Sequence, residues 1–428
     1  MGSALSAMRE TASELNPVKQ QAVAELQGLY GAFTFPERLL QQIWQRGDYD
    51  STDAATQAGQ PLKIRYPGRW NHLGGPDFAG ARLHLEGHEI TGDVELHLHA
   101  KDWDSHGHAA DPAYANVVLH VVLFPCESAV TRGFGGRTIP IFCLLPRLHH
   151  GLEEYATEAA IEQLAGRPLH QAQETLGTLS NEALARLLQQ HAAQRWRSKV
   201  HFAGERLKRL GWSAACHHAA LEILGYRFNR APMLRVATAH PFAEWVQARV
   251  ATDPIFAAGA EHWSLHGVRP LNHPRLRLRQ YAEWCRARPD WVEHLRASTV
   301  WSTCLAPPSQ GDHLGTWRRQ TKLSALRARL RAELCGDRIS GGRFDNLLGD
   351  GFMPLLAAET GQDLAGVWAG WFAGDAPESA GRVLKSLGVF DGRKRPVSQG
   401  PIQGLLGWMM EQERRARDEM HARDGRGT

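Results

Sequence analysis

The spacing of apolar residues changes once along this chain of 428 residues, and the change divides the chain into two parts. Before Leu148, short segments alternate apolar and polar residues, which is the pattern of a β-strand with one buried face. After Leu148, apolar residues recur at helical spacing and no strand pattern follows. The sequence therefore predicts an α/β (α+β) domain over residues 34–147 and a mostly α-helical domain over residues 148–428. Residues 1–33 are polar and weakly periodic, and we expect them to form an N-terminal extension.

The predicted α/β domain begins with a helix at FPERLLQQIWQRG, where Pro36 suits a first turn and the leucines, Ile43 and Trp44 make one apolar face. Three strands are expected next, at PLKIRYPG, ARLHLEG and TGDVELHLHA, with Gly and Pro at the breaks. HAADPAYAN is expected to form a turn or a short helix capped by Asp111, followed by strands at VVLHVVLF and RTIPIFCLLP. VVLHVVLF is an almost unbroken apolar run, which indicates a strand buried on both faces.

Composition sets limits on where the chain works and what it binds. The formal net charge is +4 and the isoelectric point about 8.8, which permits an acidic partner without requiring one. None of the cysteines forms a CxxC pair, so we expect neither a zinc knuckle nor a disulfide framework. The sequence has no apolar run long enough for a membrane span and no pattern typical of a signal peptide. We therefore expect a cytoplasmic chain with reduced thiols and no membrane association.

Carboxylates and imidazoles are concentrated between Gly74 and His108. If TGDVELHLHA is a strand, Asp93, Glu95, His97 and His99 project from one side. Asp77 begins the preceding strand, so two adjacent strands are expected to bring Asp77 and Glu95 together. Paired carboxylates suit Mg²⁺ or Mn²⁺, which prefer oxygen ligands and can activate a water molecule. The alternative is a solvated polar face of the sheet.

Pro76-Asp77 and Glu95-Leu96-His97 resemble the signature of the PD-(D/E)XK nuclease superfamily. That resemblance implies a core of helix, three strands, helix and strand, with Asp77, Glu95 and the first-helix acid Glu37 at a metal-dependent phosphodiesterase site. His97 departs from the pattern, because it stands where the superfamily has lysine. Lys101 is the candidate to supply the lost cation from further along the strand.

The histidines allow a second interpretation of the same region. His97 is a candidate ligand for a softer ion such as Mn²⁺ or Zn²⁺, with Zn²⁺ the less favoured choice. His106 and His108, in DSHGH, either cap backbone carbonyls in a loop or join His97 and His99 at a metal. His120, inside VVLHVVLF, is interpreted as a core histidine with its hydrogen bonds satisfied.

A resemblance to a bacterial family, domain of unknown function 2851, covers nearly the whole chain. The segments that carry it are ERLLQQIW, YPGRWNHLGGPDFAGARL, GDVELHLHAKDWDSHGH, DPAYANVVLHVV, RPLNHPRLRL and QGPIQGLL. The central segments are long and specific, but this family resemblance implies no activity.

Basic residues are concentrated in three stretches of the predicted helical domain, within Arg195–Trp212, Trp317–Glu333 and Arg269–Gln280. Arginine and lysine contact phosphates, and the tryptophans between them can stack on bases. The alternative is a solvated helix face beside a core stripe. The residues predicted to contact nucleic acid are Arg195, Arg197, Lys199, Arg318 and Arg319.

These observations predict a metal-dependent nuclease that hydrolyses DNA or RNA, with the helical domain presenting the substrate. One rival interpretation is a non-catalytic nucleic-acid-binding or scaffold protein on a decayed nuclease fold. Another is a metal hydrolase that uses histidine and carboxylate ligands and acts on a small molecule. The geometry of the site distinguishes them: Asp77 and Glu95 sharing one ion indicates the nuclease, converging histidines indicate the metal hydrolase, and scattered side chains indicate the scaffold.

Overall fold

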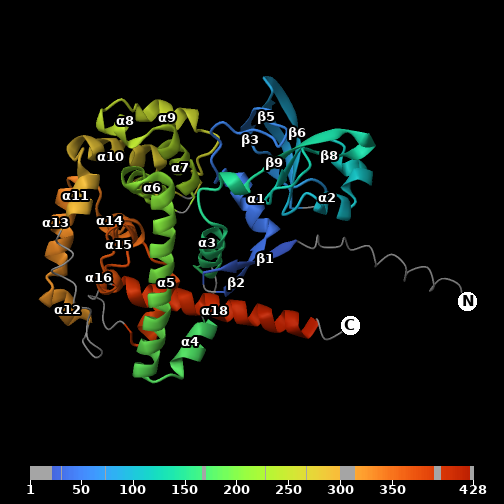
Figure 1. The fold of residues 1–428 in the computed structure, drawn as a ribbon. Coiled ribbons are helices and arrows are strands. Elements are labelled where there is room, and N and C mark those ends of the chain that lie inside the picture. Colours follow the sequence, from blue (N-terminus) through green and yellow to red (C-terminus); the bar gives the residue numbers. More distant parts are fainter. Residues whose placement is uncertain are drawn as a thin grey trace, which may run out of the picture. The chain divides into compact units, whose positions relative to one another are not determined.

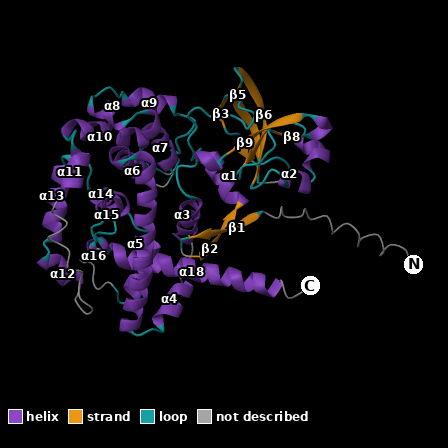
Figure 2. Ribbon diagram, in the orientation of Figure 1, coloured by secondary structure: helices purple, strands orange, loops and turns teal. Residues whose placement is uncertain are grey.

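The computed structural model describes residues 22–29, 31–72, 74–165, 170–226, 228–266, 268–298, 314–389 and 397–424. The chain divides into two compact units. The first, which we call the α/β unit, comprises Met1–Leu26, Thr34–Gln45 and Asp53–Pro146. The second, which we call the helical unit, comprises Gln27–Phe33, Arg46–Thr52 and Arg147–Thr428. Strands lie mainly in the first unit, and the second is almost entirely helical (Figure 2).

A small hairpin precedes the first helix. Its strands are β1 (Val23–Gly28) and β2 (Gly31–Pro36), and they form a two-stranded sheet of their own. We predicted no strands here, because neither strand buries a full apolar face and the period-2 signal is therefore weak. Residues 1–21 of the expected N-terminal extension lie outside the described residues.

Helix α1 (Glu37–Arg46) confirms the predicted first helix. It begins directly after Pro36, and its buried face includes Leu40, Ile43 and Trp44. The indole Nε1 of Trp44 donates a hydrogen bond of 3.0 Å to the carbonyl oxygen of Pro67, which ties the helix to the segment after β3.

The main sheet of the α/β unit is mixed, with the strand order β3-β5-β6-β7-β9-β8 and with β4 paired to β5. β3, β5 and β6 are antiparallel neighbours, whereas β6, β7 and β9 are parallel. The strands are β3 (Leu62–Tyr66), β4 (Arg69–Trp70), β5 (Phe78–Leu85), β6 (His88–His97), β7 (Val117–Val122), β8 (Val130–Arg132) and β9 (Thr138–Cys143). All five strands predicted in this domain are confirmed. The two short strands β4 and β8 were not predicted, because they are too short to show a period.

Strand β7 confirms the prediction of a central buried strand beside β6. Leu119, Val121 and Val122 are fully buried, and Leu96 of β6 lies opposite Val121. Because parallel strands need a crossover connection, the chain leaves the sheet between β6 and β7. The crossover consists of α2 (Asp102–Ser105) and the 3₁₀ turns η1 (His108–Ala110) and η2 (Pro112–Tyr114). Asp111 caps η2 as predicted, since its Oδ1 accepts a hydrogen bond of 2.8 Å from the backbone N–H of Ala113.

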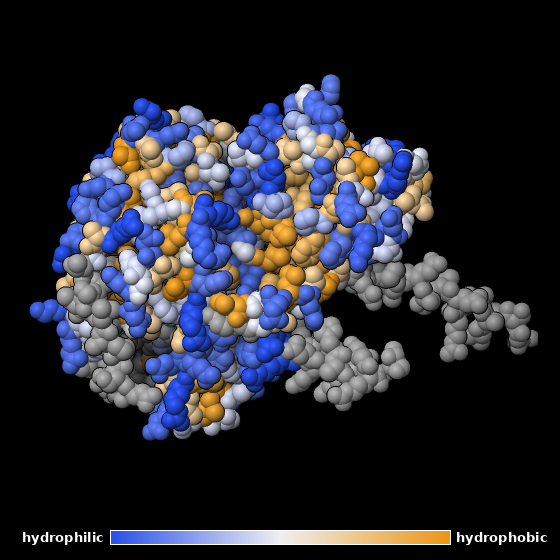
Figure 3. Space-filling model, viewed as in Figure 1, coloured by the Kyte–Doolittle hydropathy of each residue, from blue (hydrophilic) through white to orange (hydrophobic). Residues whose placement is uncertain are grey.

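The helical unit confirms the predicted mostly helical second part of the chain. Its longest element, α5 (Asn181–Leu210), is 30 residues long and is capped by Ser180, whose hydroxyl accepts a hydrogen bond from the N–H of Ala183. The last helix, α18 (Gln399–Asp424), crosses and packs against α5 (Figure 1). Hydrophilic residues follow the visible side of α5 (Figure 3), while Leu184, Leu188 and Trp196 face the core.

The structure describes further elements in the same residue ranges. The 3₁₀ turn η3 (Phe134–Gly136) lies in the α/β unit, and η4 (Leu145–Arg147) spans the end of that unit and the first residue of the next part of the helical unit. The other helices of the helical unit are α3 (Leu152–Ala165), α4 (His170–Gly177), α6 (Trp212–Leu224), α7 (Arg230–Ala239), α8 (Phe242–Val246), α9 (Thr252–Ala258), η5 (Pro270–Asn272), α10 (Pro274–Ala287), α11 (Trp291–Ala297), α12 (Leu314–Gln320), α13 (Leu323–Cys335), α14 (Gly341–Asn346), the π-helix η7 (Leu347–Phe352), α15 (Met353–Thr360), α16 (Ala365–Gly370) and α17 (Glu378–Ser386). Over the described ranges, no helix has both the length and the apolarity that crossing a bilayer requires.

Candidate metal site

Strands β5 and β6 bring Asp77 and Glu95 together. The backbone N–H of Asp77 donates a hydrogen bond of 2.8 Å to Oε2 of Glu95, and the N–H of Leu96 donates one of 3.2 Å to Oδ2 of Asp77. Both side chains are almost fully buried, with 3% and 1% of the surface of Asp77 and Glu95 exposed. Each carboxylate therefore receives a backbone hydrogen bond from the other segment, Asp77 lying directly before β5, and this offsets part of the cost of burying its charge.

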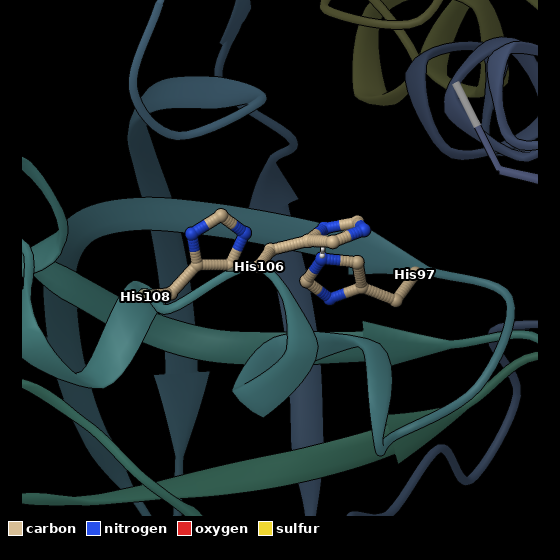
Figure 4. Close-up of side chains that lie close together, drawn as sticks. All are labelled: His97, His106 and His108. Carbon is tan, nitrogen blue, oxygen red and sulfur yellow. Dashed lines mark hydrogen bonds between the residues drawn. The ribbon is translucent and has the colours of Figure 1, made fainter. Parts of the chain in front are cut away.

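Three imidazoles converge next to Glu95. His97, His106 and His108 each offer one ring nitrogen, and these nitrogens lie within 4.8 Å of one another. Figure 4 shows the ring of His106 against that of His97, with the ring of His108 beside them. Nε2 of His97 lies 3.1 Å from Nδ1 of His106. His97 and His108 are buried and His106 is exposed, so the cluster reaches from the interior to the surface of the α/β unit.

The carboxylate of Glu95 borders this histidine cluster. Its Oε1 lies 3.3 Å from Nε2 of His108 and 3.8 Å from Nε2 of His97. One oxygen of Glu95 therefore faces the backbone of Asp77 and the other faces the imidazoles. Among the residues that the structure describes, this is the one place where three or more His, Cys, Asp or Glu side chains are arranged closely enough to hold a metal ion.

Behind the histidine cluster, two further side chains continue the line of polar contacts. Nδ1 of His97 lies 2.9 Å from Nε2 of His120, and Nδ1 of His120 lies 2.7 Å from Oγ1 of Thr131. Burial, with a smaller contribution from nearby His108, lowers the pKa of His120 to about 3, so this imidazole is neutral at physiological pH. His120 is a buried, hydrogen-bonded core histidine, as predicted, and it also contacts the candidate site.

Aromatic rings fix the orientation of the imidazoles. The fully buried Trp103 packs edge-to-face against His97 and His108, with ring centroids 6.3 and 5.3 Å apart, and its Nε1 donates to the carbonyl oxygen of Arg132. Tyr114 stacks on His108 at 3.8 Å between centroids. Trp103 and Tyr114 form a small core with Val117 and Ile139, so the crossover that carries two of the histidines is anchored to the sheet.

The local backbone explains how the histidines reach one place. β6 ends at His97, where the chain leaves the strand for α2. His106 follows α2, and its backbone N–H bonds to the carbonyl oxygens of Asp102 and Asp104. Gly107 has a φ of 73°, in the left-handed region that glycine adopts easily. This reversal directs His108 back towards the end of β6.

Three other predicted site residues are not members of the histidine cluster. Lys101 does not continue the strand as expected, because β6 ends at His97; it is exposed at the start of α2. His99 also lies beyond the strand, exposed and stacked on Phe124 at 4.8 Å, so the regular alternation ends before it. Glu37 is buried in the first turn of α1, and its Oε2 accepts a hydrogen bond of 3.3 Å from the N–H of Ala22.

Three of the basic residues predicted to contact nucleic acid bond within the helical unit. Nε of Arg195 donates to Gln403 at 2.6 Å, and Nζ of Lys199 donates to Asp350 at 3.0 Å. Arg318 donates to the carbonyl oxygens of Gly370 and Trp371. Burial lowers the pKa of both Arg195 and Arg318 to about 10. The other two, Arg197 and Arg319, are exposed.

The predicted set of metal ligands was Asp77, Glu95 and His97, and His106 and His108 were predicted as ligands only in the alternative interpretation. Their signal in the sequence was DSHGH itself, two histidines separated by a glycine that permits a reversal. Nothing in the sequence indicated that Thr131 contacts the site, because it lies in β8, a strand of three residues far along the chain from DSHGH.

Fold and site together define a class of protein: a mixed α/β unit with a buried histidine–carboxylate cluster at the end of a central strand, followed by a helical unit. The chain belongs to the family described as protein of unknown function (DUF2851), whose model matches residues 37–258. The match confirms the family resemblance over these residues, which include every residue of the cluster; the segments RPLNHPRLRL and QGPIQGLL lie outside it. The comparisons with curated proteins and with solved structures gave no match.

Proposed function

We propose that the α/β unit binds one divalent transition-metal ion through His97, His106 and His108 and is a metal-dependent hydrolase. The observation that carries the proposal is the convergence of three imidazole nitrogens within 4.8 Å beside the buried Glu95. Imidazole ligands suit Zn²⁺ and the divalent first-row transition-metal ions better than they suit Mg²⁺, which requires oxygen ligands. The geometry therefore favours Zn²⁺ over the Mg²⁺ that the paired carboxylates alone suggested.

One distance in the cluster is close to that between two ligands of the same ion. With Zn–N bonds of about 2.0–2.1 Å, neighbouring ligands of a tetrahedral site lie about 3.3–3.4 Å apart. The separation of 3.1 Å between His97 Nε2 and His106 Nδ1 is close to that value. Three protein ligands leave the fourth position of a tetrahedral site for water, which is the arrangement of catalytic zinc sites.

Hydrolysis is the chemistry that such an arrangement supports. A bound Zn²⁺ lowers the pKa of its water ligand to about 7, which supplies hydroxide at neutral pH. Oε1 of Glu95, 3.3 Å from His108 and 3.8 Å from His97, borders the same position. With an ion held by the histidines, the carboxylate of Glu95 would act as a general base and would compensate part of the positive charge.

A second candidate function, phosphodiester hydrolysis by a PD-(D/E)XK-like nuclease, is supported by the pairing of Asp77 with Glu95 across β5 and β6. The order α1, β3, β5, β6, short helices and β7 also agrees with the core that this resemblance implies. Two observations count against it. One oxygen of Asp77 accepts the backbone N–H of Leu96, and three of the five basic residues proposed to contact DNA or RNA bond within the helical unit.

The test compares two variants of the full chain, His106→Ala and Asp77→Asn, after removal of metal by a chelator. Binding of Zn²⁺, Mn²⁺ and Mg²⁺ is measured by titration calorimetry. His106 is exposed, so its removal is expected to leave the fold intact. We expect Zn²⁺ to bind the wild type, His106→Ala to bind it at least about tenfold more weakly, and Asp77→Asn to retain it. Hydrolysis of p-nitrophenyl acetate, p-nitrophenyl phosphate, bis-p-nitrophenyl phosphate, DNA and RNA is measured in parallel.

Other outcomes select the rival functions. Binding of Mg²⁺ that depends on Asp77 but not on His106, together with cleavage of DNA or RNA, would establish the nuclease arrangement instead. A wild type that binds none of the three ions would reject both metal sites and leave the non-catalytic scaffold.

A further inference from the structure

A buried line of polar side chains runs from His97 away from the metal site. It joins residues on three strands of the sheet: His97 at the end of β6, His120 in β7 and Thr131 in β8. The two contacts are 2.9 Å between His97 Nδ1 and His120 Nε2, and 2.7 Å between His120 Nδ1 and Thr131 Oγ1. His97 and His120 are fully buried and Thr131 is 8% exposed.

Which ring nitrogen of each neutral imidazole carries the hydrogen decides whether these contacts are compatible with an ion bound at His97. A neutral imidazole carries one N–H, so one ring nitrogen donates and the other accepts. For Nε2 of His97 to ligate an ion, the hydrogen of His97 must be on Nδ1, where it donates to Nε2 of His120. The hydrogen of His120 must then be on Nδ1, where it donates to the hydroxyl oxygen of Thr131. The reverse order puts a hydrogen on Nε2 of His97 and blocks the ligand.

We propose that His120 and Thr131 are positioning residues that hold His97 in the tautomer whose Nε2 lone pair faces the metal ion. The inference rests on the proposed function, since it requires an ion at His97. Partners that fix the tautomer and ring orientation of a ligating histidine commonly contribute strongly to metal affinity. Here the partner of the ligand is a second neutral histidine, whose own proton is directed by a threonine hydroxyl.

Packing around the line makes these partners difficult to replace. Trp103 contacts the rings of both His97 and His120, with centroids 6.3 and 5.1 Å away. Because the imidazoles of His97 and His120 are both fully buried, bulk water does not have access to Nδ1 of His97. A variant without an acceptor at position 120 loses the contact of 2.9 Å to Nδ1 of His97, which removes the stabilisation of the ligating tautomer that this contact provides.

The experiment measures Co²⁺ binding to the full chain by its visible absorption, which reports both affinity and coordination geometry. The key pair is His120→Leu and His120→Gln, because glutamine retains an oxygen that accepts a hydrogen bond and leucine does not. A second pair, Thr131→Val and Thr131→Ser, makes the same comparison further from the ion. The melting temperature of each metal-free variant is measured separately to report folding alone.

We expect His120→Leu to weaken Co²⁺ binding by about 10–100-fold and to reduce the tetrahedral Co²⁺ absorption. His120→Gln and Thr131→Ser should retain most of both, while Thr131→Val shows a smaller loss than His120→Leu. If the wild type binds Co²⁺ and both members of each pair bind it equally well, His120 and Thr131 are packing residues and the inference is wrong. If both His120 variants fail to fold, the Thr131 pair decides alone. A wild type that does not bind Co²⁺ rejects the proposed function itself and, with it, this inference.

Discussion

At the scale of single residues, Glu95 connects the two halves of the candidate site. Its Oε2 accepts the backbone N–H of Asp77, and its Oε1 faces His108 and His97. The first contact is structural, and a neutral amide oxygen can also make it. The second depends on negative charge, because a carboxylate stabilises an adjacent metal ion far more than an amide does. The two roles are therefore separable by one conservative substitution.

We predict that Glu95→Gln folds but binds Zn²⁺ about 10–100-fold more weakly than the wild type. The rise in melting temperature on adding Zn²⁺ should shrink accordingly, since that rise follows the ratio of ligand concentration to dissociation constant. The matched control is Asp93→Asn on the same strand, where Oδ1 of Asp93 accepts the N–H of Gly80 at 2.9 Å. An unchanged Zn²⁺-dependent rise in Glu95→Gln would exclude this carboxylate from the site.

At the scale of elements, the packing of α18 on α5 depends on a close approach of two helix backbones. A Cβ added to Gly404 of α18 would overlap the carbonyl oxygen and backbone of Leu188 in α5. Because those atoms are backbone, they cannot move aside as a flexible side chain can. Ile402, Leu405 and Leu406 lie around this glycine in the buried cluster that the two helices share.

We predict that Gly404→Ala lowers the free energy of unfolding by about 1–3 kcal/mol, because overpacking separates the two helices. The control is Gly381→Ala in α17, where an added Cβ meets nothing within 4 Å. There alanine should raise stability by about 0.5–1 kcal/mol through its better helix propensity. Urea unfolding followed by circular dichroism measures both. Equal effects of the two substitutions would contradict the close approach.

At the scale of the whole molecule, several buried or half-buried histidines are held in the neutral form. Burial is the main cause that lowers the pKa of His120 and His217 to about 3 and of His218 and His262 to about 4. His217, for example, is held by the hydroxyl of Tyr281 at 2.7 Å and the carbonyl oxygen of His240 at 3.0 Å. In the unfolded chain each imidazole takes up a proton near pH 6.5. Unfolding in mild acid is therefore coupled to proton uptake in both units.

We predict that stability falls as the pH decreases from 6.5 towards 4. Between the folded and unfolded pKa values the unfolded state binds more protons, so each such histidine contributes a loss of about 1.4 kcal/mol per pH unit in this window. Urea unfolding at a series of pH values with chelator present measures the slope. The substitution His217→Gln should reduce this slope by the contribution of one histidine. A stability that stays constant between pH 7 and 5 would show that folding leaves the pKa values of these histidines unchanged.

The sequence by itself determined the local elements and the family. Helix α1 and strands β3, β5, β6, β7 and β9 were predictable, because the period of buried positions follows from backbone geometry and each segment carries its own pattern. The adjacency of Asp77 and Glu95 followed from two neighbouring strands. The change of period at Leu148 likewise indicated where helices replace strands.

Only the tertiary structure decided which side chains meet at the site. His97 and His99 share one side of an ideal strand, yet β6 ends between them and only His97 joins the cluster. His106 and His108 join it because Gly107 reverses the chain and Trp103 anchors the crossover to the sheet. Arg195, Lys199 and Arg318 formed basic stretches in the sequence, yet each bonds within the helical unit. Periodicity is a property of a few consecutive residues, whereas convergence depends on the path of the chain between strands and on what packs against it.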